Sequence, residues 1–205
     1  MANNVKKEFE LYEPMRLWLQ KYLEDKYKGW KITTVDSHAR TLDLFLEENG
    51  VGYIRAEHDE AATIELCENV EKIIDAKICK NLLLTNRQQT VFYLLLIKGD
   101  MVFKTKYLSA QINSARLSFA NAEQMETLLD VTPGSLTVLG LMNDKEKKVN
   151  LLIEENVLKE EFFACHPMVN TATVKFKTED LIKKILPALN REYTLVNLEC
   201  KDDEQ

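Results

Sequence analysis

The 205-residue sequence contains no apolar run near the roughly 20 residues that a membrane-spanning helix needs. Its opening residues, MANNVKKEFE, lack the apolar segment of a secretory signal peptide. Three histidines and four cysteines are scattered along the chain, and no cysteine pair has the CxxC spacing of a local metal site. We therefore expect a cytoplasmic protein with reduced cysteines, no metal or other cofactor, and neither a membrane nor DNA as partner.

The chain also has no internal repeat and no low-complexity segment. Hydrophobic residues make up 45% and charged residues 29%, which is typical of an ordinary globular protein. Its length allows one hydrophobic core, or one domain of about 150 residues with an attachment.

The net charge of −6 is unevenly distributed along the sequence. Residues 72–120, called the basic segment below, carry 8 Lys and Arg against 2 Asp and Glu, and the flanking segments are acidic. Contacts with phosphates need a local positive patch rather than a basic protein. Lysines at solvated strand edges give the same pattern, so charge alone leaves both interpretations open.

Apolar periodicity predicts an amphipathic helix over 8–28 and a strand over 31–35. Asp36 or Ser37 is a suitable cap for a second helix, which the Asn-Gly pair ends before a strand over 52–58. After residue 62 the sequence alternates between helical and strand-like apolar patterns. Helices are expected over 63–74, 106–112, 122–129 and 178–187, and strands over 77–85, 91–98, 101–105, 136–142 and 149–155.

The last of these helices has Thr178 as its expected cap, acidic residues in its first turn, and Pro187 at its end. Short links between apolar runs favour antiparallel hairpins over crossovers. The sequence therefore predicts an α+β fold around a mixed, mainly antiparallel central sheet flanked by helices. We expect an appended helix and strand over 1–36, one domain over 37–200, and a disordered tail over 201–205.

A lysine and an asparagine open the apolar stretch CKNLLLTN. Lys80 is unusual at the start of a buried strand, because a buried ammonium needs a partner or a lowered pKa. Strand alternation places its side chain on the face opposite Asn81. A functional pair and a structural pair that satisfies the turn backbone both fit this pattern.

The turn TPGS joins a residue with fixed φ, Pro133, to one that permits positive φ, Gly134. Backbone N–H groups after such a pair can converge on an oxygen atom. An ordinary type II turn has the same sequence, so a binding loop and a plain turn are both open.

His166 follows an aromatic pair and opens the stretch HPMVNTAT. A lone histidine in that setting is more often a satisfied core residue than a catalytic one. Cys165 precedes it directly, and because sequence neighbours rarely form a working Cys-His pair, we expect this cysteine to pack in the core. No Ser-His-Asp or Cys-His set emerges from the sequence.

Two stretches together resemble the YbaK/ProX family, whose domains hydrolyse mischarged aminoacyl-tRNA. One is CKNLLLTN, and the other runs from RLSFANAEQMETLLDVTPGSLTVLGLMND through VNLLIEENVL to HPMVNTAT. The resemblance spans residues 40–187 and is closest to the ProX-like branch, whose usual substrate is alanine misattached to proline tRNA. It leaves residues 1–36 outside.

The resemblance implies catalytic roles for Lys80, Asn81, Gly134 and His166. The lysine would anchor the tRNA 3′ end, and the asparagine and the glycine backbone would hold the aminoacyl group. Further substrate contacts are implied for Arg116, Ser118, Phe119, Pro133, Ser135, Pro167, Asn170 and Thr171. The family has proline four residues after the glycine, and this chain departs there with Val138, which bears on the width of the amino-acid pocket.

These features predict a trans-editing aminoacyl-tRNA deacylase that hydrolyses Ala-tRNA(Pro). The ester is already activated, so a site that positions water and uses the ribose 2′-OH as proton relay needs no protein nucleophile. The expected partners are the tRNA acceptor end and prolyl-tRNA synthetase. Two alternatives remain open: a non-catalytic tRNA- or synthetase-binding module of the same fold, and a deacylase for cysteinyl-tRNA or another small aminoacyl-tRNA.

Overall fold

The computed structural model describes residues 37–58, 64–102 and 104–198. The predicted helix over 8–28, the strand over 31–35 and the tail over 201–205 lie outside these residues. The helical elements are α2 (Ser37–Glu48), α3 (Ile64–Ile74), α4 (Thr105–Gln111), α5 (Ala122–Leu129), η1 (Val138–Met142), η2 (Glu155–Lys159), α6 (Thr178–Asp180), η3 (Leu181–Ile185) and α7 (Leu186–Ala188). The strands are β1 (Tyr53–Glu57), β2 (Lys80–Asn86), β3 (Phe92–Ile97), β4 (Leu117–Phe119), β5 (Val149–Glu154), β6 (Phe162–Cys165), β7 (Ala172–Lys177) and β8 (Tyr193–Val196).

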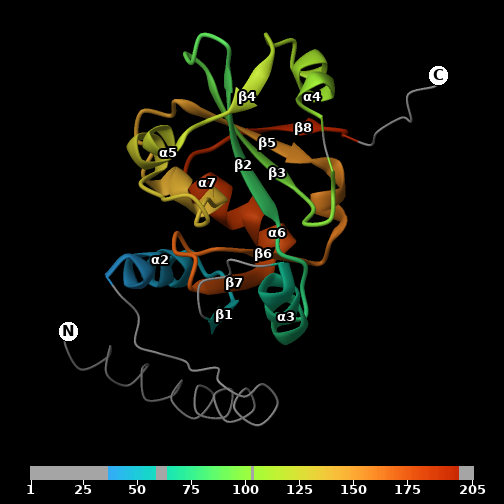
Figure 1. Cartoon of the computed structure of the whole chain (residues 1–205). Helices are drawn as coiled ribbons and strands as arrows, with labels where there is room; N and C mark the ends of the chain where they lie inside the picture. The colour runs from blue at the N-terminus through green and yellow to red at the C-terminus, as the bar shows by residue number, and fades with distance from the viewer. Residues whose placement is uncertain (1–36, 59–63, 103, 199–205) are drawn as a thin grey trace, which may run out of the picture.

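The strands form two sheets (Figure 1). The five-stranded sheet has the order β4-β2-β3-β5-β8, and the three-stranded sheet has the order β1-β7-β6. The pairs β2–β3, β2–β4, β1–β7 and β6–β7 are antiparallel, whereas β3–β5 and β5–β8 are parallel. The predicted α+β class and the mainly antiparallel pairing are therefore confirmed. The predicted hairpin between β2 and β3 is confirmed, and the two parallel pairs, which require crossover connections, make the sheet mixed as predicted.

Both faces of the five-stranded sheet are buried. Leu94 and Leu96 of β3 pack in the main core cluster, while the alternate residues Leu95 and Ile97 pack in a second cluster with Leu108 of α4. A strand that is covered on both sides reads as a continuous apolar run rather than an alternating one. This explains the runs LLL and LLLI in the sequence.

The main core lies between the two sheets. It joins Leu83 of β2 to Phe163 and Phe176 of the three-stranded sheet, and to Leu181 and Ile185 of the C-terminal helical segment. Figure 1 shows α6 and α7 between the sheets, with α2 and α3 beside the three-stranded sheet. The helix α2 contributes Leu42 and Leu46 to this core, and both are fully buried.

The C-terminal helical segment differs from the prediction at both ends. Lys177 occupies the cap position, and Thr178 is the first helical residue, with a buried hydroxyl that has no hydrogen-bond partner among the described residues. Pro187 lies within α7, and the helix ends one residue after it, at Ala188. The middle turn, η3, is a π-helix.

Two predicted strands are wrong. The stretch 136–142 contains the 3₁₀-helix η1 instead, where the Thr137 hydroxyl accepts a hydrogen bond from the Leu139 amide at 3.3 Å. The stretch 101–105 contributes no described strand residue: the Met101 amide closes a turn on the Lys98 carbonyl at 3.0 Å, and α4 begins at Thr105. Short apolar runs fit either kind of element, so local hydrogen bonds decide between them.

Lys175 is a buried lysine that fastens α3 to the three-stranded sheet. Its Nζ donates to the carbonyls of Ile74 and Asp75 at 2.7 and 2.9 Å, and lies 4.1 Å from the centroid of the Phe162 ring. The last carbonyls of a helix have no partner within the helix itself. The ammonium supplies those donors and receives cation–π stabilisation in return.

We predict that Lys175→Met lowers the free energy of unfolding by about 2–4 kcal/mol, because it leaves buried helix-terminal carbonyls without donors. Lys177→Met, two residues further along the same strand at an exposed position, serves as the control and should change stability by less than about 0.5 kcal/mol. Urea unfolding followed by circular dichroism measures both. Equal losses in the two variants would contradict the capping role.

Candidate functional site

The start of β2 and the end of β6 meet where the two sheets join. Ile78 forms a parallel bridge with Ala164, and the Cys79 amide donates to the Ala164 carbonyl at 2.8 Å. Lys80 and His166 each lie two residues beyond that bridge. The junction therefore brings the two predicted signature stretches, 86 residues apart, to one place in the fold.

Lys80 and Asn81 project to opposite faces of β2, as strand alternation requires. Lys80 is exposed, and its Nζ lies 3.4 Å from the Met101 carbonyl, which it donates to. Asn81 shares its face with Cys79 and Leu83, two residues of the main core. Lys80 thus faces solvent on one side of β2, and Asn81 faces the main core on the other.

The Asn81 amide has one satisfied end and one unsatisfied end. Its Nδ2 donates to the Cys79 carbonyl at 3.0 Å, whereas its Oδ1 is buried and has no hydrogen-bond partner among the described residues. A buried acceptor without a donor costs about 1–3 kcal/mol. Such an atom is suited to receive a hydrogen bond from an N–H or O–H group of a ligand.

The TPGS stretch forms a tight turn on the core side of the sheet. The Ser135 amide donates to the Thr132 carbonyl at 3.0 Å, and the Ser135 hydroxyl donates to the same carbonyl at 2.9 Å. Gly134 has φ +91°, as the third residue of a type II turn requires, and Pro133 precedes it at an exposed position. Both polar groups of Ser135 are therefore used to hold the turn rigid.

Val138 occupies the position where the resemblance implies proline. It is the first residue of η1 and is fully buried in the main core. The first position of a helix tolerates proline, because its N–H has no partner within the helix. Thr137 before it has φ −153° and ψ 154°, an extended conformation that a following proline also favours. The turn after Gly134 thus has a backbone compatible with either residue.

The stretch that begins at His166 forms the loop between β6 and β7. His166 Nδ1 lies 3.0 Å from the Ala172 carbonyl, so this nitrogen is the donor and Nε2 of the neutral ring is an acceptor. Pro167 is buried and Thr171 is exposed. Asn170 faces the TPGS turn, since a Cβ placed on Gly134 would lie 3.7 Å from its Nδ2.

His58 is a residue of this site that the sequence analysis did not single out. It directly follows β1; its ring lies 3.0 Å from the Thr173 hydroxyl through Nε2, and its centroid is 6.3 Å from that of His166. Its backbone amide donates to the Thr171 carbonyl at 2.9 Å. The partners are more than 110 residues away, and no local pattern signals this contact.

Arg116, Ser118 and Phe119 lie at the far end of β2. Phe119 pairs with Leu84 in the β2–β4 ladder, about 13 Å along the strand from Lys80 at ~3.3 Å per residue. All three side chains are exposed, and Phe119 is 61% exposed, so it does not pack the floor of a pocket. The structure brings Asn81, Gly134, His166 and Asn170 to one region and leaves these three apart from it.

The two described cysteines near the junction are inert thiols. Burial raises the pKa of the Cys165 thiol to about 12, although a hydrogen bond with Thr137 opposes the shift. Burial also raises the pKa of Cys79 well above its usual value, and its Sγ donates to the Ile97 carbonyl at 3.2 Å. Because a thiolate is the reactive form, neither residue is poised as a nucleophile. The expectation that Cys165 packs in the core is confirmed.

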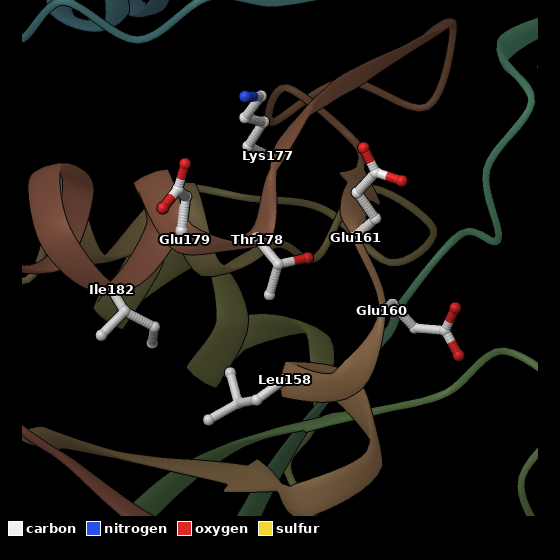
Figure 2. Close-up of a pocket in the computed structure, with 7 residues that line it drawn as sticks. All are labelled: Leu158, Glu160, Glu161, Lys177, Thr178, Glu179 and Ile182. Atoms are coloured by element: carbon white, nitrogen blue, oxygen red, sulfur yellow. The ribbon is translucent and has the colours of Figure 1, made fainter.

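A separate groove lies between η2 and the start of α6 (Figure 2). Its volume is about 320 Å³, and it is lined by Leu158, Glu160, Glu161, Lys177, Thr178, Glu179 and Ile182. None of the predicted site residues lines it. Two of its three carboxylates are paired, Glu160 with Lys98 at 2.6 Å and Glu179 with Lys183 at 2.9 Å. Its acidic lining makes it a poor match for a nucleic acid.

Within the described part of the chain, no group of three or more His, Cys, Asp or Glu side chains is arranged to hold a metal ion. Among the same residues, no helix is both long and apolar enough to cross a membrane.

A family model for the aminoacyl-tRNA editing domain matches residues 58–184, which is more than half of the chain. The chain belongs to this family and is an aminoacyl-tRNA hydrolase of the editing type. The prolyl-tRNA editing protein ProX of Acetoanaerobium sticklandii is 31% identical over 153 residues, covering 75% of this chain and 93% of that protein.

Two further proteins are similar to this chain, one in sequence and one in fold. Prolyl-tRNA synthetase associated domain-containing protein 1 of Danio rerio is 26% identical over 157 residues, covering 76% of this chain and 84% of that protein. The fold is similar to a crystal structure described as a candidate trans-editing enzyme for prolyl tRNA synthetase, with a TM-score of 0.61 and 15% identity. That match covers 80% of this chain and 98% of the other.

We predict that Val138→Pro changes the free energy of unfolding by less than about 1.5 kcal/mol, because the backbone at this position already suits proline. Gly140→Pro is the comparison. It removes the amide that donates to the Thr137 carbonyl and adds atoms where space is short, since a Cβ placed on Gly140 would lie 3.3 Å from the Cβ of Leu129. It should cost about 3 kcal/mol or more. Thermal unfolding distinguishes the two, and a large loss in Val138→Pro would contradict the backbone argument.

Proposed function

We propose that the chain is a trans-editing deacylase that hydrolyses the ester of misacylated tRNA(Pro), with Ala-tRNA(Pro) as its main substrate. Relatives named for prolyl-tRNA editing and for association with prolyl-tRNA synthetase support this choice of tRNA. The observation that carries the assignment of the site is the buried Oδ1 of Asn81, which has no hydrogen-bond partner within the described part of the chain.

In this proposal Asn81 recognises a donor on the aminoacyl end of the substrate. Because Nδ2 is held by the Cys79 carbonyl, the amide presents its oxygen rather than its nitrogen. An acceptor matches the α-amino group of the amino acid or a hydroxyl of the terminal ribose. It does not match the ester carbonyl, which has no proton to donate.

Lys80 supplies positive charge on the other side of β2. Its ammonium is exposed and makes one long contact, 3.4 Å, to the Met101 carbonyl. It is therefore available for a phosphate of the tRNA 3′ end, where a point charge is suited to electrostatic anchoring. The lysine belongs to the basic segment, which is the proposed surface for the acceptor stem.

Hydrolysis in this site proceeds without a protein nucleophile. The nearby thiols of Cys79 and Cys165 are buried and protonated, and an aminoacyl ester is already reactive toward water. We assign proton relay to the substrate's 2′-OH, with the backbone at Gly134 holding the ester. With Nδ1 donating to the Ala172 carbonyl, we assign Nε2 of His166 as an acceptor for water or a ribose hydroxyl.

Selectivity for alanine follows from size in this proposal. One methylene in an apolar pocket is worth about 1–3 kcal/mol, so a synthetase for proline cannot fully reject alanine at its synthetic site. A second site too small for proline corrects that error. The space between Gly134 and Asn170 is narrow, since even a Cβ on the glycine would contact the asparagine. We place the amino-acid side chain beside this contact.

The central test is hydrolysis of alanyl-, prolyl- and cysteinyl-tRNA(Pro) by the wild type, Lys80→Ala and Asn81→Ala. We expect release of alanine by the wild type, with kcat/KM lowered about 100-fold in Lys80→Ala. Loss of one hydrogen bond to a charged group, about 1.5–3 kcal/mol, predicts a decrease of about 10- to 150-fold in Asn81→Ala.

Lys183→Ala is the matched control for charge, because Lys183 is exposed, lies outside the basic segment and is paired with Glu179 at 2.9 Å. It should stay within about 3-fold of the wild type. A Lys80→Ala protein that works at the wild-type rate would contradict the role of the lysine. A folded protein that binds tRNA and releases none of the three amino acids would instead indicate a binding module, and preferred release of cysteine would change the substrate.

A second prediction concerns the basic segment. Arg116→Ala should weaken tRNA binding and reduce the slope of log K against log salt by about 1, because one phosphate contact is lost. Lys183→Ala, outside the basic segment and paired with Glu179 at 2.9 Å, should leave the slope unchanged. Filter binding over a range of salt concentrations measures both. Equal slopes in all three proteins would exclude Arg116 from the tRNA surface.

A further inference from the structure

Two histidines together hold three successive residues at the start of β7. The His58 amide donates to the Thr171 carbonyl at 2.9 Å, and its ring is hydrogen-bonded to the Thr173 hydroxyl at 3.0 Å. His166 Nδ1 donates to the carbonyl of the residue between them, Ala172, at 3.0 Å. The segment 171–173 is thus held by the backbone and ring of His58 and by the ring of His166.

The contact between His58 and Thr173 is partly buried, with its threonine side in the interior. Thr173 is fully buried, and the His58 ring is hydrogen-bonded to its hydroxyl at 3.0 Å. The β1–β7 ladder has its last pair at Glu57 and Ala172, and His58 adds one more hydrogen bond beyond it. The ring also lies against that of His166, tilted by 58°.

The held segment determines where Asn170 lies. Asn170 directly precedes Thr171 and faces Gly134, with 3.7 Å between its Nδ2 and a Cβ placed on the glycine. The Gly134 side of this contact is rigid, because Ser135 fastens the turn to Thr132 through its amide and its hydroxyl. The spacing between the two sides therefore depends on how firmly the loop from His166 to Thr171 is held.

We propose that His58 is a positioning residue that sets the width of the amino-acid pocket by clamping the entry to β7. It acts through Thr171 and Thr173 on Asn170, and it makes no contact with the reacting ester. This inference rests on the proposed function, since it takes the space beside Gly134 and Asn170 as the place of the amino-acid side chain. A loosened clamp widens that space, and the pocket then admits a larger side chain than alanine.

The test uses the full chain with three variants. His58→Ala removes the ring. Thr173→Val keeps the shape of the threonine and removes only its hydroxyl, so it serves even if His58→Ala fails to fold. His58→Gln is the conservative variant, because its terminal amide reaches the position of Nε2 and can hydrogen-bond Thr173.

The first readout is hydrogen exchange of the peptide covering 166–173, measured without tRNA. We expect exchange about 10-fold faster in His58→Ala and Thr173→Val, and restoration to within about 3-fold in His58→Gln. The second readout is the ratio of kcat/KM for alanyl-tRNA(Pro) to that for prolyl-tRNA(Pro). We expect this ratio to fall about 10-fold in the same two variants and to recover in His58→Gln.

Unchanged exchange in His58→Ala and Thr173→Val overturns the clamp, whatever ester the protein hydrolyses. Faster exchange with an unchanged selectivity ratio overturns the link from the clamp to the pocket. A wild type that releases no amino acid marks a failure of the proposed function itself, and it is recognised separately because the exchange measurement needs no substrate.

Discussion

The hydrogen bond from the Cys79 amide to the Ala164 carbonyl, 2.8 Å long, joins two sheets that share no strand. Together with the bridge at Ile78 it fixes where β2 leaves one sheet and where β6 ends in the other. Asn81 follows on one side of this junction and His166 on the other. This junction therefore fixes the position of Asn81 relative to His166, although the two residues belong to stretches in different sheets.

Burial on both faces of the five-stranded sheet holds β2 in place. Leu83 and Leu84, neighbours on β2, belong to different core clusters, so a shift of β2 would disturb packing on both sides at once. The Asn81 acceptor therefore keeps a fixed direction. Preorganised polar groups of this kind are effective in catalysis because they need not reorganise during the reaction.

Local sequence predicted those elements whose hydrogen bonds are local. The helix α5 was predicted with its observed bounds, and its Asn121 and Gln124 form a reciprocal capping box. The strands β6 and β7 were not predicted, and β7 has its partner β1 more than 100 residues away, from Tyr53↔Phe176 to Glu57↔Ala172. His58 was missed for the same reason, since Thr173 is 115 residues away from it. The apolar stretch 136–142 was assigned wrongly because its length and composition suit a strand, whereas the Thr137 hydroxyl caps a 3₁₀ turn there.

The position of Val138 bears on how this family can vary. The backbone around Val138 consists of an extended residue followed by the first position of a short helix. Proline four residues after the glycine is one residue that suits this backbone. Valine is a second solution, because η1 buries its side chain completely and Thr137 caps the turn through its own hydroxyl. In this chain the geometry around Gly134 is therefore retained without a proline, because the extended Thr137 and the buried Val138 satisfy the same backbone requirement.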